Sequence, residues 1–202
     1  MYHYAVRRTA EDAAATRTAL IEAALHEFAE QGFAASTLAG VAARAGVTRG
    51  AVYHHFTDKT ALRDAVLDES WDLVAAPLWA AFDRPGATLR DRLVGLAQDW
   101  LQSLRTDVRF HALMRVSMEA GPPTTDEVIA LQAAGYADWQ GRLAAAMRAA
   151  PDELAPDVDP DVAAVHVFAW LCGLCLVHDA APGALPAADA DGVAPILRGL
   201  LR

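Results

Sequence analysis

The 202-residue sequence predicts an all-α protein, in which a three-helix domain at the N-terminal end precedes a larger helical bundle. Apolar residues recur with helical spacing along most of the chain, and no stretch shows the strict alternation of a half-buried strand. Glycine and proline interrupt this pattern at positions that suit the ends of helices. Because 54% of the residues are hydrophobic, the chain is able to form the core that such a bundle requires.

The first helix is expected from about Thr9 to Gln31. Gly32 follows it, and a glycine in this place commonly takes the left-handed conformation that ends a helix. Hydrophobic residues of this segment recur at intervals of three and four, which places them on one face. That face consists of Leu20, Ile21, Ala24, Leu25 and Phe28.

Residues 37–56 have the spacing of a helix-turn-helix, with short helices expected at about 38–45 and 49–55. Thr37 and Thr48 stand at the N-cap positions, and Gly46 lies in the turn, where a positive φ is needed. Small and apolar residues are expected to hold the two helices together: Val41, Ala42, Ala45, Val47, Val52 and Phe56. The spacing alone also fits an ordinary corner between two helices whose polar residues face water.

The remainder of the chain is expected to be helical as well. A long helix opens at Asp58, and Pro77 is expected to kink or end it. Breaks that contain proline or glycine separate the helices that follow, at about 88–104, 107–121, 125–150, 160–179 and 189–201. We place the domain boundary after residue 67, so that residues 68–202 form the larger domain.

Cys172 and Cys175 are the only cysteines, and two residues separate them in an apolar run, 162–177. Such a pair can be a redox motif or half of a metal site. Neither a second pair of ligands nor a βαβ pattern accompanies it, so we expect two reduced core thiols, no metal and no cofactor. The run contains His166 and is too short for a membrane span. The N-terminal residues do not have the pattern of a signal peptide, so we expect a cytoplasmic protein without a membrane partner.

The formal net charge of −9 is unevenly distributed along the chain. Residues 1–67 hold seven basic and seven acidic side chains, so the whole excess of negative charge lies in residues 68–202. A surface of that kind repels phosphate. Any contact with nucleic acid must therefore use a local basic face in the first third of the chain.

Exposed donors are expected on the second helix of the helix-turn-helix, at Thr48, Arg49, Tyr53 and His54, and such side chains suit phosphates and base edges. Residues 16–67 also resemble the DNA-binding domain of the TetR family almost without gaps. The matching segments are Phe28-Ala29-Glu30-Gln31-Gly32-Phe33, Ser36-Thr37, Val41-Ala42, Ala45-Gly46-Val47-Thr48-Arg49-Gly50-Ala51-Val52-Tyr53, His55-Phe56, Asp58-Lys59 and Leu62.

The resemblance implies that the helix from Arg49 to His55 enters the major groove, where Arg49 and Thr48 read bases. Gly50 and Ala51 would allow the helix backbone to approach the groove closely. Thr37, Tyr53, His54 and His55 would hold the phosphate backbone of the DNA. Lys59 is the only lysine, and it lies in the first turn of a helix, where the helix dipole disfavours a cation, so we expect it to contact phosphate. The full set expected to bind DNA is Thr37, Thr48, Arg49, Gly50, Ala51, Tyr53, His54, His55 and Lys59.

The larger domain holds all five tryptophans and every methionine except the first. These residue types suit a pocket for a hydrophobic small molecule, although for each residue taken singly a plain core is the better explanation. The resemblance implies an effector pocket in this region and a homodimer formed by the last two helices. The residues expected to bind the effector are Trp100, Phe110, His111, Met114, Met118 and Trp139.

The sequence therefore predicts a DNA-binding transcriptional regulator, specifically a repressor that a small hydrophobic effector releases from a palindromic operator. The alternatives are an all-helical enzyme, with His111 or His166 acting beside an acid, and an interaction protein that does not bind DNA. No spacing of nucleophile and base predicts a catalytic site. The intact run from Thr48 to Lys59 argues against loss of DNA binding.

Overall fold

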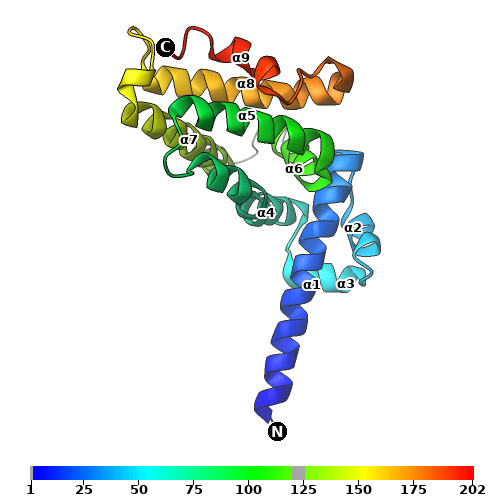
Figure 1. The fold of residues 1–202 in the computed structure, drawn as a ribbon. Helices are drawn as coiled ribbons and strands as arrows, with labels where there is room; N and C mark the ends of the chain where they lie inside the picture. The colour runs from blue at the N-terminus through cyan, green and yellow to red at the C-terminus, as the bar shows by residue number, and fades with distance from the viewer. Residues whose placement is uncertain (1, 120–125) are drawn as a thin grey trace. The chain divides into compact units, whose positions relative to one another are not determined.

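The computed structural model of the protein describes residues 2–119 and 126–202, and their regular secondary structure is helical (Figure 1). The chain divides into two compact units. The first comprises Met1–Val74 with Ala112–Ala120, and the second comprises Ala75–His111 with Gly121–Arg202. The all-α fold predicted from the sequence is confirmed, whereas the boundary after residue 67 stays a prediction.

The first unit contains α1 (Tyr2–Gln31), α2 (Leu38–Arg44), α3 (Arg49–His55) and the beginning of α4 (Lys59–Phe82), together with the later part of α6 (Val108–Glu119). Helix α1 packs against α2, and α2 packs against α3. The apolar face predicted for α1 is buried throughout. Helix α1 begins seven residues before the predicted Thr9, since residues 2–8 contain neither glycine nor proline to stop it.

Both glycines expected to end helices have positive φ angles, 76° at Gly32 and 68° at Gly46. At Gly46 the chain makes the hydrogen bonds of a tight helix C-terminus, from Gly46 N–H to the Ala43 carbonyl and from Val47 N–H to the Ala42 carbonyl. This turn lets α3 follow α2 after four residues. Any other residue type at Gly46 would be strained by its φ angle rather than by lack of space.

The second unit is a bundle built on α8 (Pro160–Ala180). Helices α5 (Leu89–Thr106) and α7 (Asp126–Ala149) pack against α8, and α9 (Ala190–Leu197) packs against α5 (Figure 1). Short 3₁₀ turns at Pro151–Glu153 and Pro182–Ala184 flank α8. Helix α6 (Val108–Glu119) contributes its first residues to this unit and its later ones to the first unit.

Proline 77 does not end α4, which continues to Phe82. The sequence analysis allowed for an end here because proline cannot donate the hydrogen bond to the carbonyl four residues earlier. That carbonyl belongs to Leu73, whose side chain is 70% exposed, and Pro77 is exposed too. Water is therefore available to the freed carbonyl, and the helix tolerates the proline on its solvent side.

Helix α8 begins with a strong N-cap and a proline in its first turn. The Asp159 carboxylate accepts hydrogen bonds from the backbone N–H groups of Asp161 and Val162, at 2.8 and 3.1 Å. Among the described residues it is the one helix long and apolar enough to cross a membrane by composition, yet it packs against α5 and α7. Only 39% of its apolar window is buried within the single chain, which leaves a large apolar face to be covered.

Candidate nucleic-acid interface

Helix α3 has one buried side and one exposed side. Val52 is fully buried and Phe56, which follows the helix, is 5% exposed, so both anchor α3 to the first unit. The opposite side carries Arg49, Tyr53 and His54, all of them exposed. Tyr53 is 48% exposed, which is more than is usual for a tyrosine in a folded domain and is typical of a recognition surface.

Arg49 and Tyr53 contact each other one helical turn apart. The Arg49 Nη2 donates to the Tyr53 hydroxyl at 3.1 Å, and the guanidinium carbon lies 5.5 Å from the centre of the Tyr53 ring. An arginine has five N–H donors, so most of them stay available to a ligand. The contact holds the guanidinium against α3, so the side chain loses less conformational entropy when it binds a ligand.

Arg49 also carries a positive charge that no carboxylate neutralises within the described part of the chain. Other arginines of the first unit are paired: Arg17 with Glu69, Arg44 with Glu30, and Arg63 with Asp64. The exposed face of α3 is therefore locally basic although the protein is acidic overall. This is the local basic face that the charge distribution requires.

Two threonines cap the helices of the motif, as predicted. The Thr37 Oγ1 accepts a hydrogen bond from Gly40 N–H at 3.0 Å, and the Thr48 Oγ1 accepts one from Ala51 N–H at 3.3 Å. Each hydroxyl acts here as an acceptor, so its own hydrogen remains free to donate. Both threonines are exposed and thus able to donate to a phosphate oxygen.

His54 and His55 differ in their surroundings. Their rings lie 5.2 Å apart, but His54 is exposed and His55 is half-buried. Burial lowers the pKa of His55, with smaller contributions from the neighbouring His54 and Arg17. The lowered pKa favours the neutral imidazole of His55 over the cation.

Lys59 has an intramolecular role that the sequence analysis missed. Its ammonium nitrogen donates to the carbonyl oxygens of Phe33, Ser36 and Ala34, at 2.6, 3.0 and 3.2 Å, and lies 4.5 Å from the centre of the Phe33 ring. These three bonds match the three hydrogens of an ammonium group. Local structure therefore does explain this lysine, contrary to the argument from the helix dipole, and its contact with phosphate stays a prediction.

The structure brings three of the six predicted effector-binding residues together. The Trp100 ring lies 5.0 Å from Phe110 and 5.5 Å from Trp139, measured between ring centres. Trp79 and Phe168, which the sequence analysis did not select, extend this group, since their rings lie 4.4 and 6.1 Å from that of Trp139. We refer to Trp79, Trp100, Phe110, Trp139 and Phe168 as the aromatic cluster.

The other three predicted effector-binding residues lie on α6, and their role in effector binding stays a prediction. His111 contacts His178 and Asp179. Met114 is buried and Met118 half-buried, and both lie in the segment of α6 that belongs to the first unit. A cavity of about 300 Å³ lies elsewhere in the second unit, lined by Met147, Arg148, Pro151, Leu154, Ala155, Pro156, Val158, Pro160 and Arg202.

Comparison with known proteins identifies the family of this chain. Residues 20–66 match the model for bacterial regulatory proteins of the tetR family. The transcriptional regulator TtgR of Pseudomonas putida is 34% identical over 178 residues, which cover 84% of this chain and 82% of TtgR. The chain belongs to the TetR family. It is a DNA-binding transcriptional regulator, and the residues that match the family model include α2 and α3.

Solved structures of TetR-family repressors resemble the whole chain. NalD of Pseudomonas aeruginosa, the secondary repressor of the MexAB-OprM multidrug efflux pump, is 28% identical with a TM-score of 0.76, covering 95% of this chain and 98% of NalD. SmeT, the repressor of the Stenotrophomonas maltophilia multidrug efflux pump SmeDEF, is 26% identical with a TM-score of 0.72, covering 92% and 90%. The likeness thus extends beyond the DNA-binding unit.

Proposed function

We propose that this TetR-family protein is a repressor that binds a palindromic operator as a homodimer and leaves it when a small hydrophobic molecule binds. The observation that carries the proposal is the exposed face of α3, where Arg49 has no carboxylate partner among the described residues. In a protein of net charge −9, a local positive face of this kind is suited to bind an anionic ligand. Duplex DNA is the anion that the helix-turn-helix recognises.

In the proposed complex α3 lies in the major groove and Arg49 reads a base. A guanidinium makes two parallel hydrogen bonds to the O6 and N7 of guanine, the most common specific contact of this kind. Gly50 and Ala51 are small, which permits a close approach of the backbone to the groove. Thr37, Thr48, Tyr53, His54 and His55 supply hydrogen bonds that fix the position of α3 on the duplex.

Lys59 supports this interface indirectly, through the backbone that precedes α2. Its ammonium group binds carbonyls of the segment between α1 and α2, which leads directly into Thr37. We propose that Lys59 positions the Thr37 hydroxyl and the start of α2. A contact of the same ammonium group with phosphate would require it to give up at least one of these hydrogen bonds.

The homodimer is proposed to form through α8 and α9. Large apolar side chains are exposed on both helices. On α8, three of them together with the exposed Ala169 and the half-buried Cys172 recur every three or four residues, which is the spacing of a helix that packs against another helix. This stripe, which we call the α8 stripe, contains Val162, Val165, Ala169, Cys172 and Leu176. Two copies related by a two-fold axis would bury the stripe in a four-helix bundle and present two α3 helices to a palindrome.

The aromatic cluster is proposed as the place where the effector binds. Trp100 is 1% exposed, and its indole Nε1 has no oxygen or nitrogen acceptor among the described residues. The Cys175 thiol forms a hydrogen bond with Trp100, and because sulfur is a weak acceptor, a ligand that carries an oxygen or nitrogen acceptor would bond the indole more strongly. Since the rings pack on one another, an aromatic ligand would enter by separating them and replacing their contacts.

The regulated genes are proposed to encode a multidrug efflux system, as they do for NalD and SmeT. SmeT has been solved in complex with triclosan, a small aromatic molecule. An aromatic effector of that kind fits the aromatic cluster. The protein would then act in the cytoplasm, where the DNA and such an effector meet.

A mobility shift on the DNA upstream of the protein's own gene tests the proposal. We expect a complex that survives excess nonspecific DNA, and release of that complex by a compound that raises the melting temperature of the free protein. Failure of every variant of the upstream region to shift would favour the interaction-protein alternative. Turnover of a compound found in the thermal screen would favour the enzyme.

A further inference from the structure

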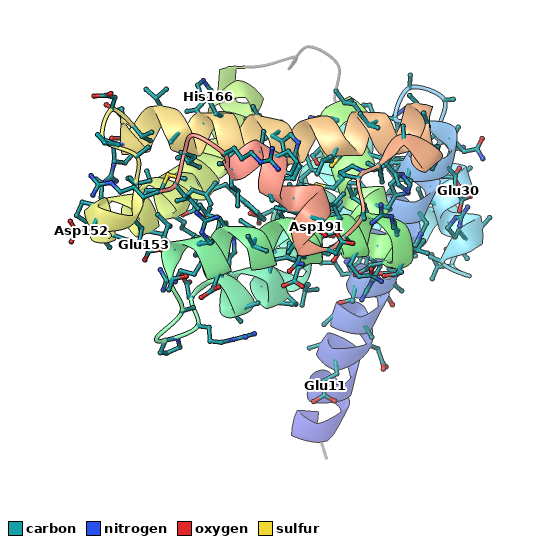
Figure 2. The ribbon with its side chains drawn as sticks, turned by 45° about the horizontal axis from the view of Figure 1, so that its top comes forward. Glu11, Glu30, Asp152, Glu153, His166 and Asp191 are labelled. Carbon is teal, nitrogen blue, oxygen red and sulfur yellow. The ribbon has the colours of Figure 1, made fainter. Side chains whose placement is uncertain are left out.

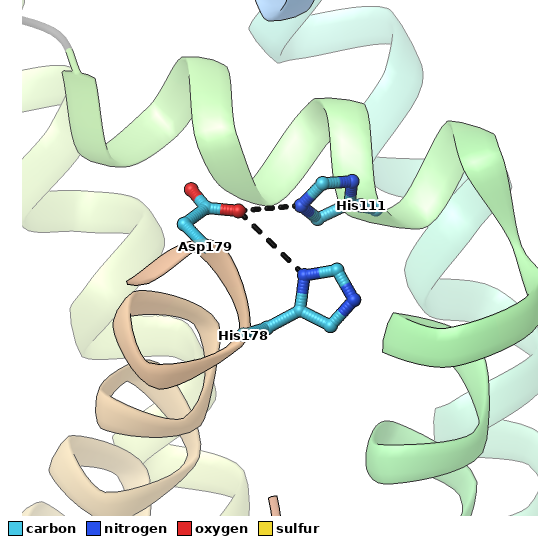
Figure 3. Close-up of side chains that lie close together, drawn as sticks. All are labelled: His111, His178 and Asp179. Carbon is cyan, nitrogen blue, oxygen red and sulfur yellow. Dashed lines mark hydrogen bonds and ion pairs between the residues drawn. The ribbon is translucent and has the colours of Figure 1, made fainter. Parts of the chain in front are cut away.

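One group of side chains has no part in the proposed regulator: His111, His178 and Asp179, all in the second unit (Figure 3). His111 lies near the start of α6, and the other two lie in the last turn of α8. The Asp179 Oδ1 is 2.6 Å from the His111 Nε2 and 3.6 Å from the His178 Nδ1. The ligand atoms of all three residues lie within 4.8 Å of one another.

We propose that these three residues bind a divalent transition metal ion, with Zn²⁺ as the best match. Two imidazole nitrogens and one carboxylate oxygen are ligands that Zn²⁺ takes in proteins. Three protein ligands leave the fourth tetrahedral position for water or another donor. The sequence analysis excluded a metal because it looked for ligands around the cysteines, and His111 lies 68 residues from Asp179.

The distances fit such a site after a small movement. Bonds of roughly 2.0–2.2 Å in a tetrahedron place ligand atoms roughly 3.3–3.6 Å apart. The Asp179–His178 distance lies within that range, and the Asp179–His111 hydrogen bond is shorter by less than 1 Å. Turning the Asp179 carboxylate away from His111 would lengthen this distance toward the tetrahedral range.

The unsatisfied nitrogen of His178 provides an independent reason. Its Nδ1 is buried and has no hydrogen-bond partner among the described residues. The Asp179 oxygen that it faces is, at 3.6 Å, too far away for a hydrogen bond. A buried polar atom without a partner is rare, and an ion bound by the His178 Nδ1 would give that nitrogen one.

The electrostatic surroundings also favour a cation. The cluster lies at the C-terminal end of a 21-residue helix, where the helix dipole stabilises positive charge. The excess of acidic residues lies in the same part of the chain, residues 68–202. The three side chains are 29%, 17% and 35% exposed, so the cluster is partly open to solvent.

Cys175 lies one turn before Asp179 on α8, but it is not expected to be a ligand. Its sulfur is not among the ligand atoms that lie within 4.8 Å of one another, and burial raises the pKa of its thiol to about 12. The site is thus distinct from the Cys-x-x-Cys pair. Phe110 precedes His111, so a bound metal would also fix the chain next to the aromatic cluster.

Metal binding is tested on the full-length protein, freed of metal with a chelator and kept free of DNA. Co²⁺ is titrated first, because its visible spectrum reports four-coordinate binding, and Zn²⁺ is then added to displace it. We expect one ion per chain and a rise in melting temperature with Zn²⁺. His111→Gln, His178→Gln and Asp179→Asn should each weaken binding by at least about 100-fold, since removal of even an indirect partner costs about 10–100-fold.

His166→Gln is the matched control. His166 lies on the same helix as His178, is exposed, and projects away from the bundle (Figure 2). This variant should bind the metal as the original protein does. Equal binding by all the variants, loss of binding in Cys175→Ala but not in Asp179→Asn, or no binding by the unaltered protein would each overturn the proposal. None of these outcomes bears on repression, because no DNA is present.

Discussion

Arg49 and Lys59 are two cations of the DNA-binding unit with different surroundings. The Arg49 guanidinium contacts only Tyr53 among the described side chains and faces solvent, whereas the Lys59 ammonium donates three hydrogen bonds to backbone carbonyls. A group whose donors are used inside the protein has little to offer a ligand. The two residues are therefore expected to affect DNA binding by different routes.

Replacement of Arg49 should reduce both affinity and sequence preference. Arg49→Ala is expected to weaken operator binding by about 1–3 kcal/mol and to remove the preference at one base pair in each half-site. Fluorescence anisotropy on operators with single base changes measures both effects. Arg84→Ala, which removes an exposed arginine between α4 and α5, is the control. Unchanged base preference in Arg49→Ala would show that another residue reads the groove.

Replacement of Lys59 should reduce stability first. Lys59→Met keeps most of the side-chain stem but leaves three carbonyls without their donor, two of them in part-buried bonds. We expect a loss of about 1–3 kcal/mol in the free energy of unfolding and an equal weakening of binding to all sequences. Denaturant unfolding and anisotropy measure the two. An unchanged unfolding curve with a flatter salt dependence of binding would instead assign Lys59 to phosphate contact.

At the scale of elements, the helices were predictable because their signals are local. Thr37 and Thr48 cap helices that start at the next residue, and Gly46 takes the positive φ that its place in the turn predicts. The partners of Lys59 and His111 were not predictable, since they lie 23–26 and 68 residues away in the chain. Residues that meet only through tertiary packing leave no periodic pattern in the sequence.

The α8 stripe extends this reasoning to an interface. A charge placed on it should separate the dimer. Val165→Glu is expected to raise the dimer dissociation constant by a factor equivalent to at least about 3 kcal/mol, because each copy would bury a carboxylate without a partner. The single chain should stay folded, since Val165 is 44% exposed and glutamate is a better helix former than valine.

Sedimentation equilibrium measures the dissociation constant of this variant. Val108→Glu is the control, because Val108 is 69% exposed on α6 and lies outside the stripe. Operator affinity should fall together with dimer content in the first variant and remain unchanged in the second. Dissociation of the control, or a stable dimer of Val165→Glu, would place the interface on another surface.

At the scale of the whole molecule, DNA and effector are assigned to different units. Arg49 and the recognition helix lie in the first unit, and the aromatic cluster lies in the second. An effector with equal affinity for the operator-bound and free forms would release nothing, however tightly it bound. Repression that ends on effector binding therefore requires the effector to prefer the form that does not fit the operator.

This preference must be reciprocal, which gives a quantitative test. The coupling between two sites is typically about 1–3 kcal/mol, and each ligand must weaken the other by the same factor. We expect triclosan, as an aromatic probe, to quench or shift the tryptophan fluorescence of the protein, because Trp139 contacts both Trp79 and Trp100 in the aromatic cluster. The same titration should need about 5–150 times more probe when saturating operator is present. A nonspecific duplex of equal length should leave the titration unchanged. If operator is released while the probe binds with identical affinity in both titrations, the two sites are not coupled and the allosteric account fails.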